Sequence, residues 1–140
     1  MVDLSKPSPS ELAGAIGINI IGFGDGGCTV DCTVAEHHLN LGGVAHGGLH
    51  ATMLDTAMGG ALVSTLPKEE WCATAQLDIS YLNAATSGTH LTASGRVVRR
   101  GRNLAHMEGD IVADDGSVVA TAKGTWAVWS KRPPSQGGTE

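Results

Sequence analysis

Hydrophobic residues along the chain follow two repeat patterns, which predict different secondary structures. Over residues 49–66 they recur at spacings of three and four, so that Leu54, Met58 and Leu62 share one face of a helix. Pro67 would end this helix because proline lacks an N–H and disfavours helix at the residue before it. Other apolar residues lie off that face, and we therefore expect a long helix that is buried nearly all round.

Outside this helix the sequence is interpreted as strands, and residues 28–35 and 73–82 show the apolar and polar alternation of half-buried strands. Two such runs precede the helix and four follow it, over residues 18–23, 28–35, 73–82, 90–99, 102–113 and 118–129. Turns rich in glycine and aspartate join neighbouring runs, which favours hairpins and a mostly antiparallel sheet. The sequence therefore predicts an α+β fold in which one antiparallel sheet wraps a long central helix.

A short helix is expected before the first strand. Ser8 and Glu11 have the spacing of a capping box, and Pro9 would occupy the first helical position of a helix that reaches Ala15. The end of the chain is polar and contains proline and glycine, which is typical of a flexible tail. We therefore expect an N-terminal segment with a short helix, a single folded domain and a tail, over residues 1–16, 17–130 and 131–140.

Composition narrows the class of protein. A length of 140 residues fits one domain, and a formal net charge of −5 argues against a general nucleic-acid binder. Neither a membrane-spanning apolar run nor a secretory signal is evident, so we expect a cytoplasmic protein. The three cysteines, Cys28, Cys32 and Cys72, have no basic neighbours in sequence and are interpreted as small buried hydrophobic residues.

One charged residue stands out in the predicted helix. Between Glu36 and Lys68, Asp55 is the only Asp, Glu, Lys or Arg. A lone carboxylate in a buried helix is costly unless it is paired or has a function. A glycine-rich loop, from Asn40 to Gly48, comes directly before this helix. We therefore take Asp55 and this loop as the candidate functional residues.

The loop and the helix together carry a specific motif. Asn40 is followed at fixed spacing by His46 and a pair of glycines, and Asp55 lies seven residues beyond the second glycine, Gly48. This pattern resembles the hotdog-fold acyl-CoA thioesterases of the phenylacetate-degradation (PaaI-like) type. The order of elements agrees, so the resemblance covers roughly residues 18–129. It implies a hotdog fold and hydrolysis of an acyl-CoA thioester.

The resemblance assigns a role to each residue of the motif. Backbone N–H groups at a helix start lack partners and favour negative charge, and the Gly47 amide would donate to the thioester carbonyl. Asp55 would act as general base or as nucleophile, and both roles suit a carboxylate. Asn40 would orient the thioester or the water, and Thr74 would hold the water. His46 either caps the helix or takes part in catalysis.

Gly47 and Asp55 are too far apart to act together within one chain. Eight helical residues correspond to about 12 Å of rise. The resemblance implies that a dimer solves this, with Asp55 reaching the Gly47 amide of its partner. We therefore expect at least a homodimer, and a homotetramer built as a dimer of dimers.

Arginines form a second candidate site. Four of the five arginines lie within seven residues around Gly101, and guanidinium groups suit phosphates such as those of coenzyme A. A solvated hairpin tip is the alternative. The expected substrate-binding residues are Gly48, Arg99, Arg100, Arg102 and Asn103.

Other interpretations stay open. His46 and His50 have a spacing seen in zinc sites, but the zincin motif needs glutamate after the first histidine, where this chain has Gly47, so neither metal nor cofactor is expected. A hydratase or dehydratase of acyl thioesters is disfavoured because no histidine lies at the usual distance before Asp55. Retention of both Asn40 and Asp55 argues against a non-catalytic acyl-CoA binder.

The identity of the acyl group stays open. Asn83 and Ala84 stand where the family often has a basic residue and proline, at the end of a strand near the ligand. Aryl-acetyl, benzoyl and medium-chain acyl groups are all compatible with the sequence.

Overall fold

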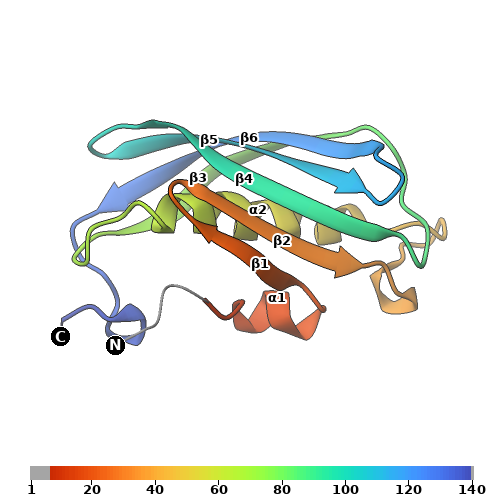
Figure 1. Ribbon diagram of the computed structural model, residues 1–140, viewed down its shortest axis with the longest axis horizontal. Helices are drawn as coiled ribbons and strands as arrows, with labels where there is room; N and C mark the ends of the chain where they lie inside the picture. Colours follow the sequence, from red (N-terminus) through yellow and green to blue (C-terminus); the bar gives the residue numbers. More distant parts are fainter. Residues whose placement is uncertain (1–6, 140) are drawn as a thin grey trace.

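The computed structural model describes residues 7–139, in which six strands form one antiparallel sheet in the order β1-β2-β4-β5-β6-β3 (Figure 1). The strands are β1 (Asn19–Gly24), β2 (Gly27–Thr33), β3 (Trp71–Tyr81), β4 (His90–Arg100), β5 (Leu104–Ala113) and β6 (Val118–Trp129). The helices are α1 (Glu11–Ala15), α2 (Gly47–Val63) and the short 3-10 helices η1 (Glu36–His38) and η2 (Pro134–Gln136). All six predicted strands and the long helix are present, with ends shifted by a few residues.

The sheet curves around α2, which lies in its hollow (Figure 1). Met53, Leu54 and Met58 on the covered side of the helix are fully buried. The helix approaches β4 so closely at Gly95 that a Cβ there would lie 2.4 Å from the carbonyl oxygen of Ala57. Glycine is therefore required at this position for the helix to sit against the sheet. The expected α+β hotdog arrangement is confirmed.

The expectation that α2 is buried nearly all round was wrong. Gly48 and Asp55 are exposed, and Thr52 and Gly59 on the same stripe are only partly covered. The reason lies in the sheet, because β3 is its last strand and ends the cover on that side of the helix. Residues 73–76 of β3 are exposed as well. A bare helix stripe and an unpaired sheet edge thus lie side by side.

The N-terminal helix starts later than predicted. Ser10 rather than Ser8 is the N-cap, since its backbone is extended and its hydroxyl accepts a hydrogen bond from the Ala13 N–H at 3.2 Å. Beyond the helix, the buried His38 ties this segment to the body of the protein. Its Nδ1 accepts from the Ala35 N–H at 2.9 Å, so its Nε2 carries the proton and donates to the Ile16 carbonyl at 2.6 Å.

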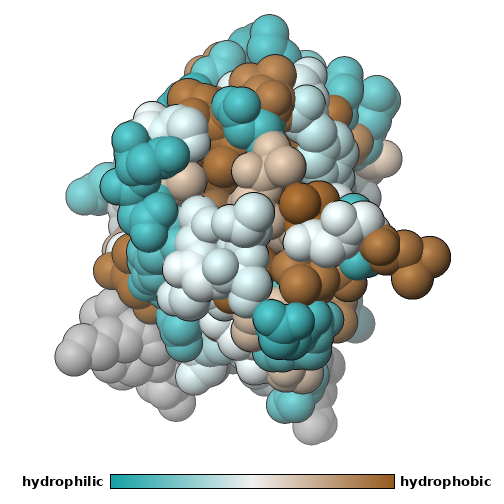
Figure 2. Space-filling model, turned by 90° about the vertical axis from the view of Figure 1, so that its right-hand side faces the viewer, coloured by the Kyte–Doolittle hydropathy of each residue, from teal (hydrophilic) through white to brown (hydrophobic). Residues whose placement is uncertain are grey.

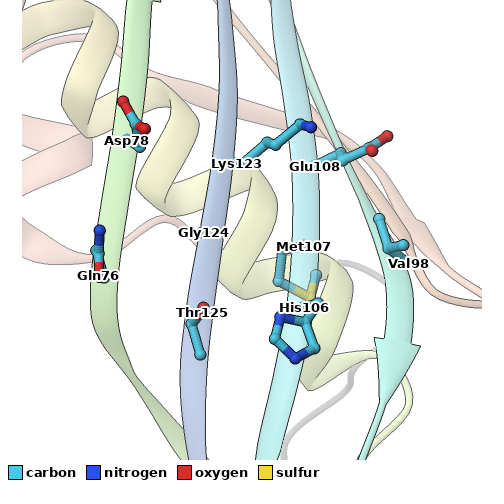
Figure 3. Close-up of a pocket in the computed structure, with 9 residues that line it drawn as sticks. All are labelled: Gln76, Asp78, Val98, His106, Met107, Glu108, Lys123, Gly124 and Thr125. Atoms are coloured by element: carbon cyan, nitrogen blue, oxygen red, sulfur yellow. The ribbon is translucent and has the colours of Figure 1, made fainter.

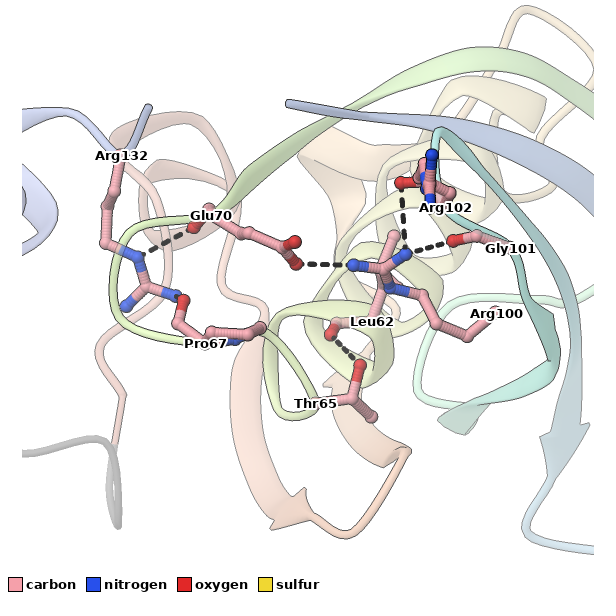
Figure 4. A network of polar contacts seen from close by, with 8 residues as sticks. All are labelled: Leu62, Thr65, Pro67, Glu70, Arg100, Gly101, Arg102 and Arg132. Atoms are coloured by element: carbon pink, nitrogen blue, oxygen red, sulfur yellow. Dashed lines mark hydrogen bonds and ion pairs between the residues drawn. The ribbon is translucent and has the colours of Figure 1, made fainter. Parts of the chain in front are cut away.

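The chain remains fixed for some residues after β6. Arg132 is only 5% exposed, and its guanidinium donates to the carbonyl oxygens of Glu70 and Pro67 at 2.9 and 3.3 Å (Figure 4). It also lies over the ring of Trp71, 5.3 Å from the centroid. The segment expected as a tail therefore begins with a residue that is packed against the turn after α2.

The three cysteines are free and buried, as predicted. Burial raises the pKa of both Cys28 and Cys72 to about 11, and burial is also the main cause that raises the pKa of Cys32. The thiols are therefore protonated at neutral pH and pack as small apolar side chains. None of the helices described over residues 7–139 has the length and hydropathy needed to cross a membrane.

Candidate functional site

A cavity of about 600 Å³ opens at the N-terminal end of α2. Asn40, His46 and Gly47 line it from the loop and the helix start, and the segment from Tyr81 to Ala85 lines it from the end of β3. Figure 2 views the end of the molecule that carries the loop before α2, where hydrophobic side chains gather among paler ones. The cavity thus combines an apolar wall with the polar start of a helix, which is typical of a ligand site.

The helix start leaves one N–H available to a ligand. His46 is the N-cap, and its Nδ1 accepts from the Gly48 N–H at 2.8 Å, while its carbonyl accepts from the Leu49 N–H at 2.9 Å. The N–H of Gly47 has no acceptor within residues 7–139. The capping role considered for His46 is therefore present, and it leaves the Gly47 amide free at the edge of the cavity.

Asn40 has its side-chain oxygen fixed by its own loop. That oxygen accepts from the N–H groups of Gly42 and Val44 at 2.9 and 3.3 Å. Because both contacts are with donors, the oxygen and nitrogen of the amide are assigned unambiguously. The remaining NH2 group is a donor beside the cavity, where the thioester or a water molecule would need one.

Tyr81 is a site residue that the sequence did not reveal. Its hydroxyl donates to the carbonyl of Gly47 at 2.8 Å, and its ring lies 3.2 Å from where a Cβ at position 47 would be. A side chain at position 47 would therefore require the Tyr81 ring to shift by a few tenths of an ångström. The only sequence signal is the place of this single tyrosine at the end of a predicted strand.

Asp55 and Thr74 form a separate pair. The Thr74 hydroxyl donates to a carboxylate oxygen of Asp55 at 2.5 Å, and both residues are exposed in the single chain. Neither lines the cavity at Gly47. The structure therefore brings the predicted residues together in two groups, an amide group (Asn40, His46 and Gly47) and a carboxylate group (Asp55 and Thr74), which lie about two turns apart along α2.

The arginines around Gly101 do not form one patch. Arg100 forms an ion pair with Glu70 and donates to the carbonyl oxygens of Gly101 and Arg102 (Figure 4). Arg96 pairs instead with Glu108 and Asp110 on β5, at 2.9 and 3.4 Å. Arg99, Arg102 and Asn103, which were predicted to bind the substrate, are exposed at this hairpin.

A shallow hollow on the other face of the sheet has a different character (Figure 3). Its charged side chains alternate across the strands, with Lys123 opposite Asp78 on one side and Glu108 on the other. Opposite charges on neighbouring strands stabilise each other, which is typical of a solvent-exposed sheet face. None of the residues that line this hollow lines the cavity at the start of α2.

The two histidines with the zinc spacing use their Nδ1 atoms in different hydrogen bonds. His46 uses Nδ1 as an acceptor for the Gly48 N–H, whereas His50 uses Nδ1 as a donor to the His46 carbonyl at 3.2 Å. Within residues 7–139, His, Cys, Asp and Glu side chains form no group of three that could hold a metal ion.

Comparison with known proteins identifies the family. The sequence model of the thioesterase superfamily matches residues 42–120. A hypothetical thioesterase from Streptococcus pneumoniae, solved with coenzyme A, is 31% identical, with a TM-score of 0.79 over 86% of this chain and 94% of that one. Structures of that protein include one variant with an aspartate and one with a threonine replaced by alanine.

Two further relatives agree with this result. The PaaI protein of E. coli, from the phenylacetic acid degradation operon, is 28% identical with a TM-score of 0.80, covering 86% of this chain and 85% of that one. Human acyl-coenzyme A thioesterase 13 is 27% identical over 77% of each chain. The chain therefore belongs to the thioesterase superfamily and is a thioester hydrolase with a PaaI-like hotdog fold.

Proposed function

We propose that the protein hydrolyses an acyl-CoA to the free acid and coenzyme A at sites that two copies of the chain build together. Each site would combine the amide group of one copy with the carboxylate group of its partner. The observation that carries this proposal is the separation between the free Gly47 N–H and the Asp55–Thr74 pair within one chain. The relatives solved with coenzyme A and acetyl-CoA support the substrate class.

The Gly47 N–H would donate to the carbonyl oxygen of the thioester. Negative charge develops on this oxygen when the carbonyl carbon is attacked, and the start of α2 favours negative charge. Losing one donor of this kind typically raises the barrier by about 3–4 kcal/mol. The Asn40 amide would supply a second donor to the thioester or to the attacking water.

Asp55 would supply the base or the nucleophile. As a base it takes a proton from water while the water oxygen bonds to the carbonyl carbon, and that proton then leaves with the coenzyme A thiolate. As a nucleophile it attacks the carbonyl carbon and expels the coenzyme A thiolate as the C–S bond breaks, and water then hydrolyses the resulting anhydride to the free acid and the Asp55 carboxylate. The Thr74 hydroxyl holds one carboxylate oxygen in place, which leaves the other oxygen available in either route.

The bare edge of β3 supports a homodimer. A second copy that pairs with β3 across a two-fold axis would cover residues 73–76 and the exposed stripe of α2 at once. Asp55 lies beside this edge, so the same contact would bring it toward the partner's cavity. We further propose a homotetramer built from two such dimers, as the sequence resemblance implies.

The hairpin between β4 and β5 is proposed to contact the phosphates of coenzyme A. Arg99, Arg102 and Asn103 are exposed there, and guanidinium groups bind phosphate oxygens. Arg100 would act as a support, because its contacts with Glu70 and the Arg102 carbonyl fix the hairpin. No metal ion or separate cofactor takes part in the proposed reaction.

Release of free thiol from a panel of acyl-CoAs, with the wild type and Asp55→Asn side by side, tests the proposal. We expect hydrolysis of part of the panel by the wild type and a loss of roughly a hundredfold or more in Asp55→Asn. Binding without turnover would contradict it and favour a non-catalytic binder. Addition of water to an enoyl-CoA in place of hydrolysis would favour the hydratase alternative.

A further inference from the structure

His50 is a buried imidazole beside the proposed thioester site. It is 3% exposed, it lines the cavity at the start of α2, and it lies three residues after Gly47. Residues three apart on a helix are neighbours on the same face. His50 is therefore about one turn along the cavity wall from the amide that would hold the thioester carbonyl.

The hydrogen bond of Nδ1 fixes the chemistry of the ring. Nδ1 lies 3.2 Å from the His46 carbonyl oxygen, and because a carbonyl only accepts, Nδ1 carries the proton. Burial lowers the pKa of His50, which outweighs the opposing effect of that backbone hydrogen bond. The imidazole is thus neutral near pH 7, and Nε2 presents a lone pair.

Nε2 has no partner of its own within residues 7–139. Among these residues every fully buried side-chain nitrogen or oxygen has a hydrogen-bond partner, so Nε2 is not fully buried. The exposed part of His50 therefore opens on the cavity that it lines. Tyr81 donates no hydrogen bond to Nε2, because its hydroxyl donates to the Gly47 carbonyl. Its ring lies edge-on to the His50 ring, with 5.7 Å between the two ring centroids.

The surroundings of this acceptor are largely apolar. Ala45, Leu82 and Ala85 share the cavity with it. An acceptor that a bound apolar group would cut off from water, with no donor in its place, costs free energy. A ligand that offers a donor at this point is therefore favoured over the same ligand without one.

We propose that His50 is a specificity-determining residue whose Nε2 accepts a hydrogen bond from a hydroxyl on the acyl group. This inference rests on the proposed function, because the acyl group must enter the cavity with its thioester on the Gly47 N–H. Three helical residues correspond to roughly 4.5 Å of rise. The hydroxyl therefore belongs to a short hydroxyacyl or hydroxyaryl group, within a few bonds of the carbonyl.

Matched pairs of substrates test this assignment. The pairs are butyryl-CoA with 3-hydroxybutyryl-CoA, and benzoyl-CoA with 4-hydroxybenzoyl-CoA. We expect the wild type to prefer the hydroxylated member of at least one pair by about tenfold or more in kcat/KM. His50→Leu, which removes the acceptor, should bring that ratio near one, because the hydroxylated member of the pair loses more kcat/KM than the plain acyl-CoA does. His50→Gln, which offers an amide oxygen near the position of Nε2, should restore part of the preference.

The results that overturn the inference are distinct. They are a wild type without preference in either pair, a ratio that His50→Leu leaves unchanged, or an equal loss on all four substrates. Circular dichroism and melting temperatures of the variants separate misfolding from lost recognition. If no thioester is cleaved, the proposed function fails on its own. The same ratio, measured as Kd by calorimetry with the four intact acyl-CoAs, then still decides the role of His50.

Discussion

The hydroxyl of Tyr81 donates to the carbonyl oxygen of Gly47 at 2.8 Å, and this contact joins the end of β3 to the first residue of α2. The ring of Tyr81 also fills the space beside Gly47, 3.2 Å from an ideal Cβ. A strand end thus fixes the residue whose N–H is proposed to hold the thioester. Position and orientation of such a donor matter because catalysis depends on preorganised dipoles.

Tyr81→Phe removes the hydroxyl and keeps the ring. We expect kcat to fall roughly five- to tenfold with little change in KM, since one hydrogen bond contributes about 1 kcal/mol and here supports the donor. Steady-state hydrolysis of the best acyl-CoA measures this effect. A kcat equal to that of the wild type would show that packing alone positions Gly47.

Gly47→Pro removes the proposed donor with little change to the fold. Proline is tolerated at the first helical position, and the extended backbone of His46 (φ −62°, ψ 138°) is the conformation that a residue before proline adopts. No hydrogen bond within the described chain is lost, because this N–H has no acceptor there. We expect kcat to fall about a hundred- to a thousandfold.

The matched control for this variant is Gly47→Ala. Alanine meets the same Tyr81 ring at 3.2 Å but keeps the N–H. We expect a much smaller loss of kcat for alanine than for proline, with similar melting temperatures for both. Equal losses in the two variants would attribute the effect to crowding and contradict the donor role.

Gly95→Ala should destabilise the fold from a position outside the cavity at the start of α2. The new Cβ would lie 2.4 Å from the Ala57 carbonyl oxygen, so α2 must move away from β4. Overpacking of this kind typically costs about 1–3 kcal/mol, and several degrees of melting temperature should be lost. The control is Gly22→Ala on β1, whose Cβ meets only Thr29 at an ordinary 3.5 Å. Equal melting temperatures of the two variants would contradict the close approach of helix and sheet.

The sequence predicted those parts of the molecule that local patterns encode. Alternation and turn residues marked all six strands, and the motif in the loop marked Asn40, His46 and Gly47 as one group. The contact between Tyr81 and Gly47 spans 34 residues, and no local pattern reports on it. The exposure of Asp55 was missed for a physical reason: the sequence does not reveal that β3 is the last strand of the sheet and ends the cover on this side of the helix.

The arginine cluster shows the same limit. Arg96 and Arg100 are four residues apart and would share a face of a regular strand, but the β-bulge between Val97 and Arg99 interrupts the alternation. Arg96 therefore pairs with acids of β5, while Arg100 pairs with Glu70, 30 residues away. The clustering in sequence predicted one shared phosphate site. In the structure Arg99 and Arg102 are exposed, whereas Arg100 is half-buried in its ion pair with Glu70.

The central claim is that two copies share each site, and complementation between two inactive variants tests it most directly. Asp55→Asn lacks the carboxylate and Gly47→Pro lacks the amide donor, so each variant alone should be nearly inactive. When both are co-expressed in equal amounts, random pairing makes half of the dimers mixed. One of the two sites in each mixed dimer is intact, which predicts recovery of about a quarter of wild-type activity. A mixture no more active than its components, with dimers verified by mass, would contradict a shared site.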